Sequence, residues 1–289
     1  LDQGKGISGR FLNVLQKADA LVCVVRAFDD PSVPHVEGSV DSHRDAVTME
    51  MELAMADLAF LERHLDRLKA SLRAARTQER EQVLREQALV QRVKTQLEAD
   101  VPIREQTLTE EEARTLANYP LVTATPLLLV FNIGESGLPS ALALEKELER
   151  RWDRPQVKAV AICAKLEMEL GQLSAAEEEE FRVSMGAPES GLDRATRLSY
   201  QLLGLISFLT VGEDEVRAWP IRQGTVAVKA AGKVHSDIER GFIRAEVVSY
   251  DDLVRCGSLA EARKQAVLRQ EGKGYQVKDG DVINFLFNV

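Results

Sequence analysis

The chain has 289 residues, of which 45% are hydrophobic and 29% are charged, and its formal net charge is −9 at pH 7. This composition is typical of a soluble globular protein, and the length allows two or three domains. The excess of acids argues against a protein that binds polyanions with its whole surface, but a local basic patch is compatible with it. Because no run of about 18 apolar residues occurs, we expect no membrane-spanning segment.

The start of the chain and its cysteines indicate a cytoplasmic protein. Leu1 begins a sequence that has no initiating Met and is not similar to a signal peptide, and we expect further residues to precede it. The cysteines are odd in number and widely spaced, which predicts reduced thiols, with neither a disulfide framework nor a metal site. They are Cys23, Cys163 and Cys256.

A glycine-rich stretch opens the chain. Gly4, Gly6 and Gly9 indicate a mobile loop, which we interpret as a candidate switch loop. It is not followed by Lys-Ser/Thr, and the phosphate-binding pattern Gly-x-x-x-x-Gly-Lys-Ser/Thr occurs nowhere in the chain. The apolar, β-branched run 20–26 follows, and it predicts a strand buried on both faces of a parallel sheet. The loop 29–31 ends this strand.

A long helical region begins at Ala46. Apolar residues recur there every seven positions, which predicts a coiled-coil seam. The seam residues are Met51, Leu58, Leu65 and Leu72, with Ala54, Leu61 and Leu68 between them. A second charged stretch repeats the spacing at Val83, Val90 and Leu97. We expect a long antiparallel helical hairpin that is closed by Pro102.

The turn of this hairpin is basic. Lys69, Arg73 and Arg76 occur with no acid between residues 69 and 76, so they are candidate contacts to RNA phosphates. Along the rest of the hairpin, interleaved acids offset the basic residues. That pattern favours a solvated coiled coil with i,i+4 ion pairs as the simpler interpretation of those charges.

Two further apolar strands end in polar residues. The strand 127–131 leads into 132–135 (Asn-Ile-Gly-Glu), and the strand 157–162 leads into 163–165 (Cys-Ala-Lys). Two such strand ends hold the purine in a P-loop NTPase, although a strand that ends in a polar turn is the simpler alternative. The candidate base-binding residues are Asn132, Ile133, Glu135, Cys163 and Ala164. Alternating strands and helices predict one α/β domain with a helical insertion.

These residues leave the identity of the base open. Guanine-specific NTPases carry Asn-Lys-x-Asp, and the Asp accepts hydrogen bonds from guanine. Here Ile133 stands at the Lys position and Glu135 replaces the Asp, which removes the reason to prefer guanine. The backbone N–H of Ala164, however, would suit guanine O6 better than the amine of adenine. Asn132 is compatible with N7 of either purine.

From residue 204 the pattern changes to short strands. Residues 206–211 and 216–221 predict two strands. Residues 276–277 and 282–288 predict a closing hairpin around a polar turn. The order of elements predicts a compact β-grasp module of about 85 residues.

Three motifs of this last part closely resemble the TGS domain of the Obg-like ATPase (YchF) family. They are 214–225 (Asp-Glu-Val-Arg-Ala-Trp-Pro-Ile-Arg-Gln-Gly-Thr), 230–237 (Ala-Ala-Gly-Lys-Val-His-Ser-Asp) and 239–247 (Glu-Arg-Gly-Phe-Ile-Arg-Ala-Glu-Val). Upstream, 28–30 (Phe-Asp-Asp) and 35–38 (His-Val-Glu-Gly) are also similar to that family. The resemblance therefore covers nearly the whole chain.

The resemblance implies an α/β fold: a partial P-loop NTPase (G-domain-like) sheet, an inserted antiparallel helical coiled-coil hairpin and a C-terminal β-grasp (TGS) domain. It implies that residues 1–45 and 119–203 form the remainder of the nucleotide-binding domain, 46–118 the coiled-coil insertion and 204–289 the TGS domain. The adenine-contacting Asn-x-x-Glu of the family corresponds to Asn132 and Glu135. Its Ser-Ala-Lys loop corresponds to 163–165, with Cys in place of Ser.

The family resemblance also implies a function. Members hydrolyse ATP in preference to GTP, use Mg²⁺ and associate with ribosomes, so we expect a purine nucleotide and the ribosome or ribosomal RNA as partners, and neither DNA nor a membrane. The family's phosphate-binding loop and Mg²⁺ ligands would lie upstream of Leu1. We therefore assign no catalytic or metal-binding residue to this chain and expect it to be inactive alone. The alternative is a non-catalytic RNA- or ribosome-binding adaptor that uses the hairpin and the TGS domain.

Overall fold

The computed structural model describes residues 9–73, 76–185, 189–212 and 215–288. The chain divides into two compact units, Leu1–Leu202 and Leu203–Val289. In the candidate switch loop, Gly4 and Gly6 lie outside the described residues, whereas Gly9 begins the first helix.

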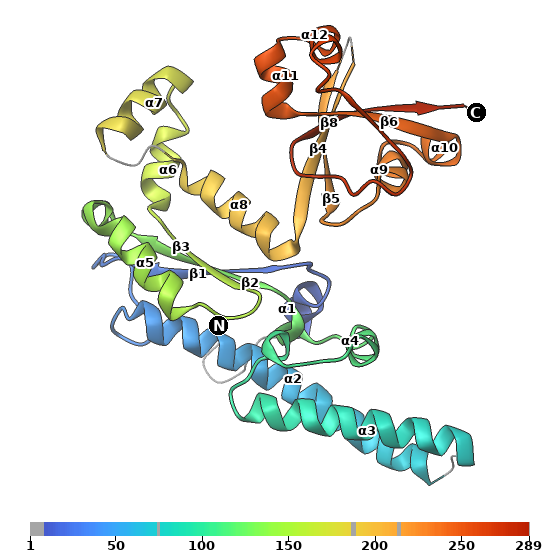
Figure 1. Ribbon diagram of the computed structural model, residues 1–289. Coiled ribbons are helices and arrows are strands. Elements are labelled where there is room, and N and C mark those ends of the chain that lie inside the picture. Colours follow the sequence, from blue (N-terminus) through green and yellow to red (C-terminus); the bar gives the residue numbers. More distant parts are fainter. Residues whose placement is uncertain (1–8, 74–75, 186–188, 213–214, 289) are drawn as a thin grey trace. The chain divides into compact units, whose positions relative to one another are not determined.

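The first unit is built on a parallel three-stranded sheet (Figure 1). Its strands lie in the order β1 (Leu21–Ala27), β2 (Leu127–Ile133) and β3 (Val157–Ile162). The parallel register, with Leu127 opposite both Leu21 and Val157, brings the carboxyl ends of all three strands to one edge. The helical elements are α1 (Gly9–Leu15), α2 (Ser42–Leu72), α3 (Thr77–Glu98), η1 (Ile103–Glu105), α4 (Glu110–Leu116), η2 (Val122–Ala124), η3 (Glu135–Ser140), α5 (Ala141–Arg151), α6 (Ala164–Leu170), α7 (Ala175–Ser184) and α8 (Gly191–Leu203).

Both faces of the central strand are covered. On one face, α2 contributes Ala46 and Leu53 to the core, and Trp152, directly after α5, packs with them. On the other face, Leu128 and Val130 of β2 pack against α8. A strand with helices on both faces needs apolar side chains at every position, which explains the continuous apolar run from Leu127 onward.

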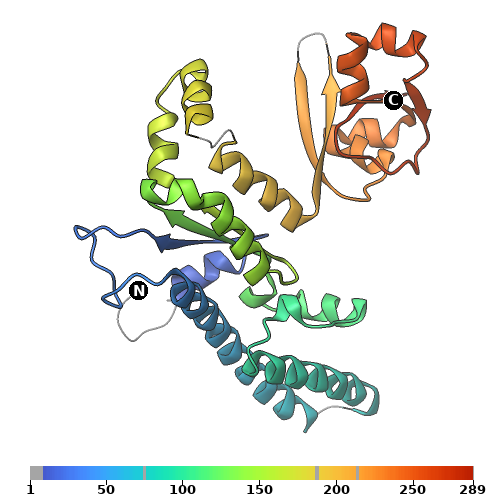
Figure 2. The same cartoon turned by 60° about the vertical axis from the view of Figure 1, so that its left-hand side comes forward.

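Helices α2 and α3 form the predicted hairpin and lie side by side in both views (Figures 1 and 2). Leu61 and Leu65 of α2 pack against Val90 of α3 in a core of their own. The predicted seam is wrong at its first position, since Met51 is 51% exposed while Leu53 is buried. The reason is that the first half of α2 packs on the sheet, so its buried face is set by the sheet and not by α3.

The second unit contains a mixed five-stranded sheet in the order β5-β4-β8-β6-β7, in which β4 and β8 run parallel and the other neighbours run antiparallel. Phe208 and Ala245 face α9, and Leu209 and Val248 lie on the side of α11 and α12. The elements are β4 (Leu205–Val211), β5 (Val216–Arg222), α9 (Ala227–Val234), α10 (Ser236–Arg240), β6 (Phe242–Ser249), α11 (Tyr250–Cys256), α12 (Leu259–Lys264), β7 (Arg269–Glu271) and β8 (Asp281–Phe287).

One predicted pairing in this unit is wrong. Residues 276–277 do not form a hairpin with the last strand, because Gln276 bridges Val226. The last strand, β8, pairs instead with β6 and β4. Among the helices of the described part of the chain, none is long and apolar enough to cross a membrane.

Candidate functional site

The two predicted base-reading segments lie next to each other at the carboxyl edge of the parallel sheet. Asn132 near the end of β2 stands opposite Ile162 of β3. The backbone N–H of Ala164 donates a hydrogen bond of 3.1 Å to Oδ1 of Asn132. One side chain therefore joins the loop after β2 to the loop after β3.

A pocket of about 500 Å³ opens at this edge, within the range of about 300–1,000 Å³ that is usual for small-molecule sites. It is lined by the loop after β1, by the end of β2 with the following segment as far as Leu144 of α5, and by the start of α6. The lining side chains include Phe28, Asp29, Asp30, Asn132, Glu135, Ser136 and Lys165. The loop after β1 adds Phe28, Asp29 and Asp30 to the base-binding candidates that the sequence predicts.

Two of the predicted base-binding residues are buried. Ile133 and Cys163 are each 4% exposed and belong to the core beneath the pocket. Their side chains pack in the hydrophobic interior, so any contact that they make with a bound base would come from the backbone. Asn132 is half-buried, while Glu135 and Ala164 are exposed.

An ion pair joins the two predicted base-reading segments. Nζ of Lys165 lies 2.8 Å from Oε1 of Glu135, and both side chains are largely exposed. The hydrogen bond from Lys165 to Glu135, followed by the negative charges of Glu135 and Glu169, raises the pKa of Lys165. The carboxylate that replaces the guanine-reading Asp is thus already engaged by a cation of the neighbouring loop.

The loop after β1 is held by the side chain of Arg26. Its guanidinium donates to the backbone carbonyls of Phe28 (3.0 Å), Asp30 (3.1 Å) and Val33 (2.7 Å). Oδ1 of Asp30 accepts hydrogen bonds from the hydroxyl and the N–H of Ser32, and these bonds lower the pKa of Asp30. The available signal for this loop was topological, because the carboxyl end of β1 must lie beside that of β2 in a parallel sheet.

The same loop is tied to the start of α2 by a histidine. Nε2 of His35 lies 2.9 Å from Oδ2 of Asp45 in the first turn of α2. Nδ1 of His35 accepts a hydrogen bond of 3.2 Å from the N–H of Glu37. His35 therefore bonds both to its own loop and to the start of α2.

The predicted RNA-contacting residues lie at the far end of the hairpin. Lys69 pairs with Asp66 at 3.3 Å. Arg73 and Arg76 are exposed, and within the described ranges neither has an ion-pair partner. The described residues also contain no group of three His, Cys, Asp or Glu side chains that could hold a metal ion.

Comparison with known proteins places the chain in a family. Residues 205–288 match the family model YchF-GTPase_C, described as a protein of unknown function (DUF933). Over 99% of its length the chain is 38% identical to the Ribosome-binding ATPase YchF of Bacillus subtilis (strain 168), of which it covers 78%. It is 35% identical to Obg-like ATPase 1 of Caenorhabditis elegans, with 99% of this chain and 72% of the relative aligned.

A solved structure shows the same architecture. The Schizosaccharomyces pombe YchF GTPase superposes with a TM-score of 0.85 at 30% identity, over 99% of this chain and 77% of that one. The match confirms the predicted α/β fold with a parallel sheet, a helical insertion and a mixed C-terminal sheet consistent with a TGS domain. With both the sequence and the fold shared over nearly its full length, the chain belongs to the YchF family of Obg-like ATPases.

Proposed function

We propose that the chain supplies the base-binding part, the coiled-coil arm and the TGS domain of a ribosome-associated P-loop NTPase, which when intact binds and hydrolyses ATP in preference to GTP. The purine would lie at the carboxyl ends of β2 and β3, in the pocket between Asn132 and Lys165. Relatives that share more than a third of its residues are named ribosome-binding ATPases. Within this proposal, residues 1–45 and 119–203 serve the nucleotide, 46–118 form the coiled-coil arm and 204–289 the TGS domain of a cytoplasmic protein.

The hydrogen bond from Ala164 N–H to Asn132 Oδ1 is the observation that carries the proposal. It orients the Asn132 amide so that its Nδ2 hydrogens are left to donate to N7 of a purine. It also uses the N–H that guanine O6 would otherwise require. A second lone pair on Asn132 Oδ1 is available to the 6-amino group of adenine, so this arrangement favours ATP.

Hydrolysis in this class depends on positioning water and on stabilising the charge of the transferring phosphoryl group, for which the family uses Mg²⁺. Among the described residues no group of three His, Cys, Asp or Glu side chains that could hold a metal ion occurs, and Mg²⁺ in such sites is held mainly by water and substrate phosphates with one or two protein oxygens. We therefore derive no metal-dependent step from these residues. Their proposed task is to bind and orient the base.

The proposal predicts that Asn132→Ala weakens nucleotide binding. Loss of one hydrogen bond to the base and of the brace to Ala164 costs about 1.5 kcal/mol, or about tenfold in Kd. Titration with a fluorescent ATP analogue in Mg²⁺ buffer, with displacement by ATP and GTP, measures the change. Asn118→Ala is the matched control, because that amide donates only to the backbone carbonyls of Arg114 and Thr115 in α4.

Unchanged ATP affinity in Asn132→Ala, or equal weakening in Asn118→Ala, would contradict the site assignment.

A second candidate function, the non-catalytic adaptor, is favoured by one observation: the exposed and unpaired Arg73 and Arg76 among the described residues of the hairpin end. Salt-sensitive association with ribosomes by a chain that binds no nucleotide would favour the adaptor over the ATPase.

A further inference from the structure

Helix α2 belongs to two hydrophobic cores at once. It is 31 residues long, which corresponds to about 46 Å at 1.5 Å per residue. Ala46 and Leu53 pack in the core of the parallel sheet. Leu61, Leu65 and Leu68 pack in the core of the hairpin. A single uninterrupted helix therefore runs from the neighbourhood of the pocket into the hairpin.

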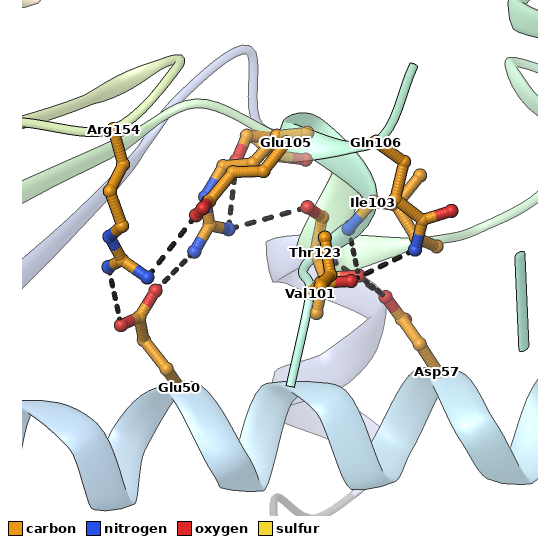
Figure 3. A network of polar contacts seen from close by, with 10 residues as sticks. Glu50, Asp57, Val101, Ile103, Glu105, Gln106, Thr123 and Arg154 are labelled. Atoms are coloured by element: carbon orange, nitrogen blue, oxygen red, sulfur yellow. Dashed lines mark hydrogen bonds and ion pairs between the residues drawn. The ribbon is translucent and has the colours of Figure 1, made fainter. Parts of the chain in front are cut away.

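Two carboxylates interrupt the inward-facing stripe of this helix. Asp57 is 1% exposed, and the side chain of Glu50, seven residues earlier, is 12% exposed. Figure 3 shows both side chains projecting from the same side of α2. Apolar residues would fill such positions without the large desolvation cost of a buried carboxylate, which must be offset by pairing and hydrogen bonds.

Asp57 holds the segment that enters β2. Its Oδ1 accepts from the N–H of Val122 at 3.0 Å. Its Oδ2 accepts from the N–H of Thr123 at 2.7 Å and from the Thr123 hydroxyl at 2.6 Å. Val122 and Thr123 open η2, directly before β2, whose opposite end carries Asn132. Three donors therefore fix α2 to the strand that contributes the main base-binding candidate.

Glu50 holds the segment that enters β3. Its Oε1 lies 2.5 Å from Nη2 of Arg104 in η1, and its Oε2 lies 2.7 Å from Nη2 of Arg154. Arg154 stands in the turn between α5 and β3, and Glu105 completes the cluster at 3.3 Å from Arg154 (Figure 3). The four charges balance, and Arg154 ties α2 to the second strand that ends at the pocket.

We infer that Glu50 and Asp57 form a clamp that makes the hairpin a rigid extension of the pocket sheet. The clamp, defined by these two carboxylates and their donors, fixes α2 to the amino ends of β2 and β3. The loop that lines the pocket leads into the same helix and is joined to it by His35 and Asp45. A change in the pocket that moves α2 would therefore move the hairpin end, and this last consequence rests on the proposed function.

The clamp differs from ordinary apolar packing because it fixes the angle of the hairpin relative to the sheet. Apolar contacts along α2 tolerate small rotations, because they are not directional. Hydrogen bonds to a buried carboxylate depend strongly on angle, and each unpaired donor left behind is costly. Removing the charge of Glu50 should therefore loosen the angle between hairpin and sheet while the helices themselves persist.

Pulsed electron paramagnetic resonance tests the clamp on the full chain without nucleotide. Spin labels at Arg67→Cys on the exposed side of α2 and Glu149→Cys on α5, in a Cys256→Ser background, report the distance from hairpin to sheet. We expect a single narrow distance distribution that becomes at least twofold wider in Glu50→Gln. Glu52→Gln, which removes the same charge two residues along α2, should leave the width unchanged.

Asp57→Asn is the second variant. It keeps the shape of the side chain but replaces one acceptor oxygen with an amide N–H₂, so that a donor faces the donors of Thr123. It should widen the distribution in the same way, with helix content by circular dichroism as the check on folding. A width that stays within experimental error of the parent in folded Glu50→Gln and Asp57→Asn would overturn the clamp. Because no nucleotide is added, this outcome is independent of whether the chain binds ATP.

Discussion

Asn132 illustrates how one side chain defines a site. Its amide oxygen accepts the Ala164 N–H, so the two loops keep a fixed separation at the mouth of the pocket. Arg26 does the same for the third loop through three backbone carbonyls. In both cases a side chain from a strand of the parallel sheet fixes a segment that borders the pocket.

The thiol of Cys23 should be chemically inert in the folded protein. Burial, followed by the negative charge of Glu50, raises its pKa from 9.0 to about 11. Since each pKa unit changes the thiolate fraction tenfold, about 100-fold less thiolate is present at pH 8 than for an ordinary cysteine. We expect iodoacetamide to modify Cys23 about 100-fold more slowly in the native chain than in urea.

Quantitative mass spectrometry of the Cys23 peptide measures this rate. The urea-unfolded chain is the control for the intrinsic reactivity of the same peptide. A native rate within a few-fold of the unfolded rate would show that the thiol is neither shielded nor held protonated by its surroundings.

At the scale of elements, Glu167 joins three helices. From α6 it accepts hydrogen bonds from Arg182 of α7 at 3.1 and 2.8 Å. It also accepts from the Ser190 hydroxyl at 3.2 Å and the Gly191 N–H at 3.0 Å, at the start of α8. Burial alone would raise the pKa of Glu167, but these donors outweigh it and lower the pKa below its ordinary value of 4.5.

A carboxylate whose pKa is lowered in the folded state stabilises the fold above its unfolded pKa, and this contribution is lost as the pH falls through the folded pKa. Glu167→Gln should therefore lower the free energy of unfolding by about 2 kcal/mol at pH 7. The difference should shrink as the pH falls below 4.5, because the parent then loses the same contribution. Urea unfolding followed by Trp152 fluorescence in a Trp219→Phe background measures both values.

Glu169→Gln is the control for the charge change, since the only ion pair that Glu169 makes within the described residues is a 4.0 Å contact with Lys165 between exposed groups. Such surface pairs contribute at most about 1 kcal/mol. An equal loss of stability in Glu167→Gln at pH 7 and at pH 3.5 would mean that the ionised carboxylate is not the source of the stabilisation.

Most elements could be predicted from local pattern, and the exceptions depend on contacts that are distant in sequence. The prediction that the strand 20–26 is buried on both faces is wrong, because β1 lies at the end of the sheet order and its Val22 and Val24 are 59% and 66% exposed. The run 127–131 predicts a buried strand, and β2 occupies Leu127–Ile133. Met51 was placed in the coiled-coil seam but is exposed, because periodicity alone does not tell which core a shared helix faces. Gln276 was paired with the wrong segment, because strand partners depend on contacts far apart in sequence.

The site shows the same division. The proximity of Asn132 and Ala164 could be predicted, because neighbouring parallel strands end at the same edge of the sheet. The hydrogen bonds from Arg26 to the loop after β1 could not be predicted, because every residue has a backbone carbonyl and the sequence does not indicate which ones accept. The link from Glu50 to Arg154 spans 104 positions, and a charged pair at that separation is indistinguishable in sequence from two solvated residues.

On the scale of the whole molecule, charge is distributed unevenly. The net charge of −9 disfavours a polyanion, yet Arg73 and Arg76 are exposed near the end of the hairpin. A ribosome-binding chain with this composition must present basic residues locally, because binding to phosphates depends on where the cations lie. The hairpin end meets this condition, since no acid occurs between residues 69 and 76.

The Arg73→Ala/Arg76→Ala double variant should therefore weaken ribosome association and reduce its salt dependence. Each phosphate contact contributes about one to the slope of log K against log salt, so the slope should fall by about two. Arg150→Ala/Arg151→Ala changes the net charge equally at the exposed end of α5 and is the matched control. Sedimentation with ribosomes over a series of salt concentrations gives both slopes.

Equal effects of the two pairs would indicate a general charge effect, whereas no effect of the hairpin pair would place the contact elsewhere. Only a selective loss in the hairpin variant supports direct contact between this arm and RNA.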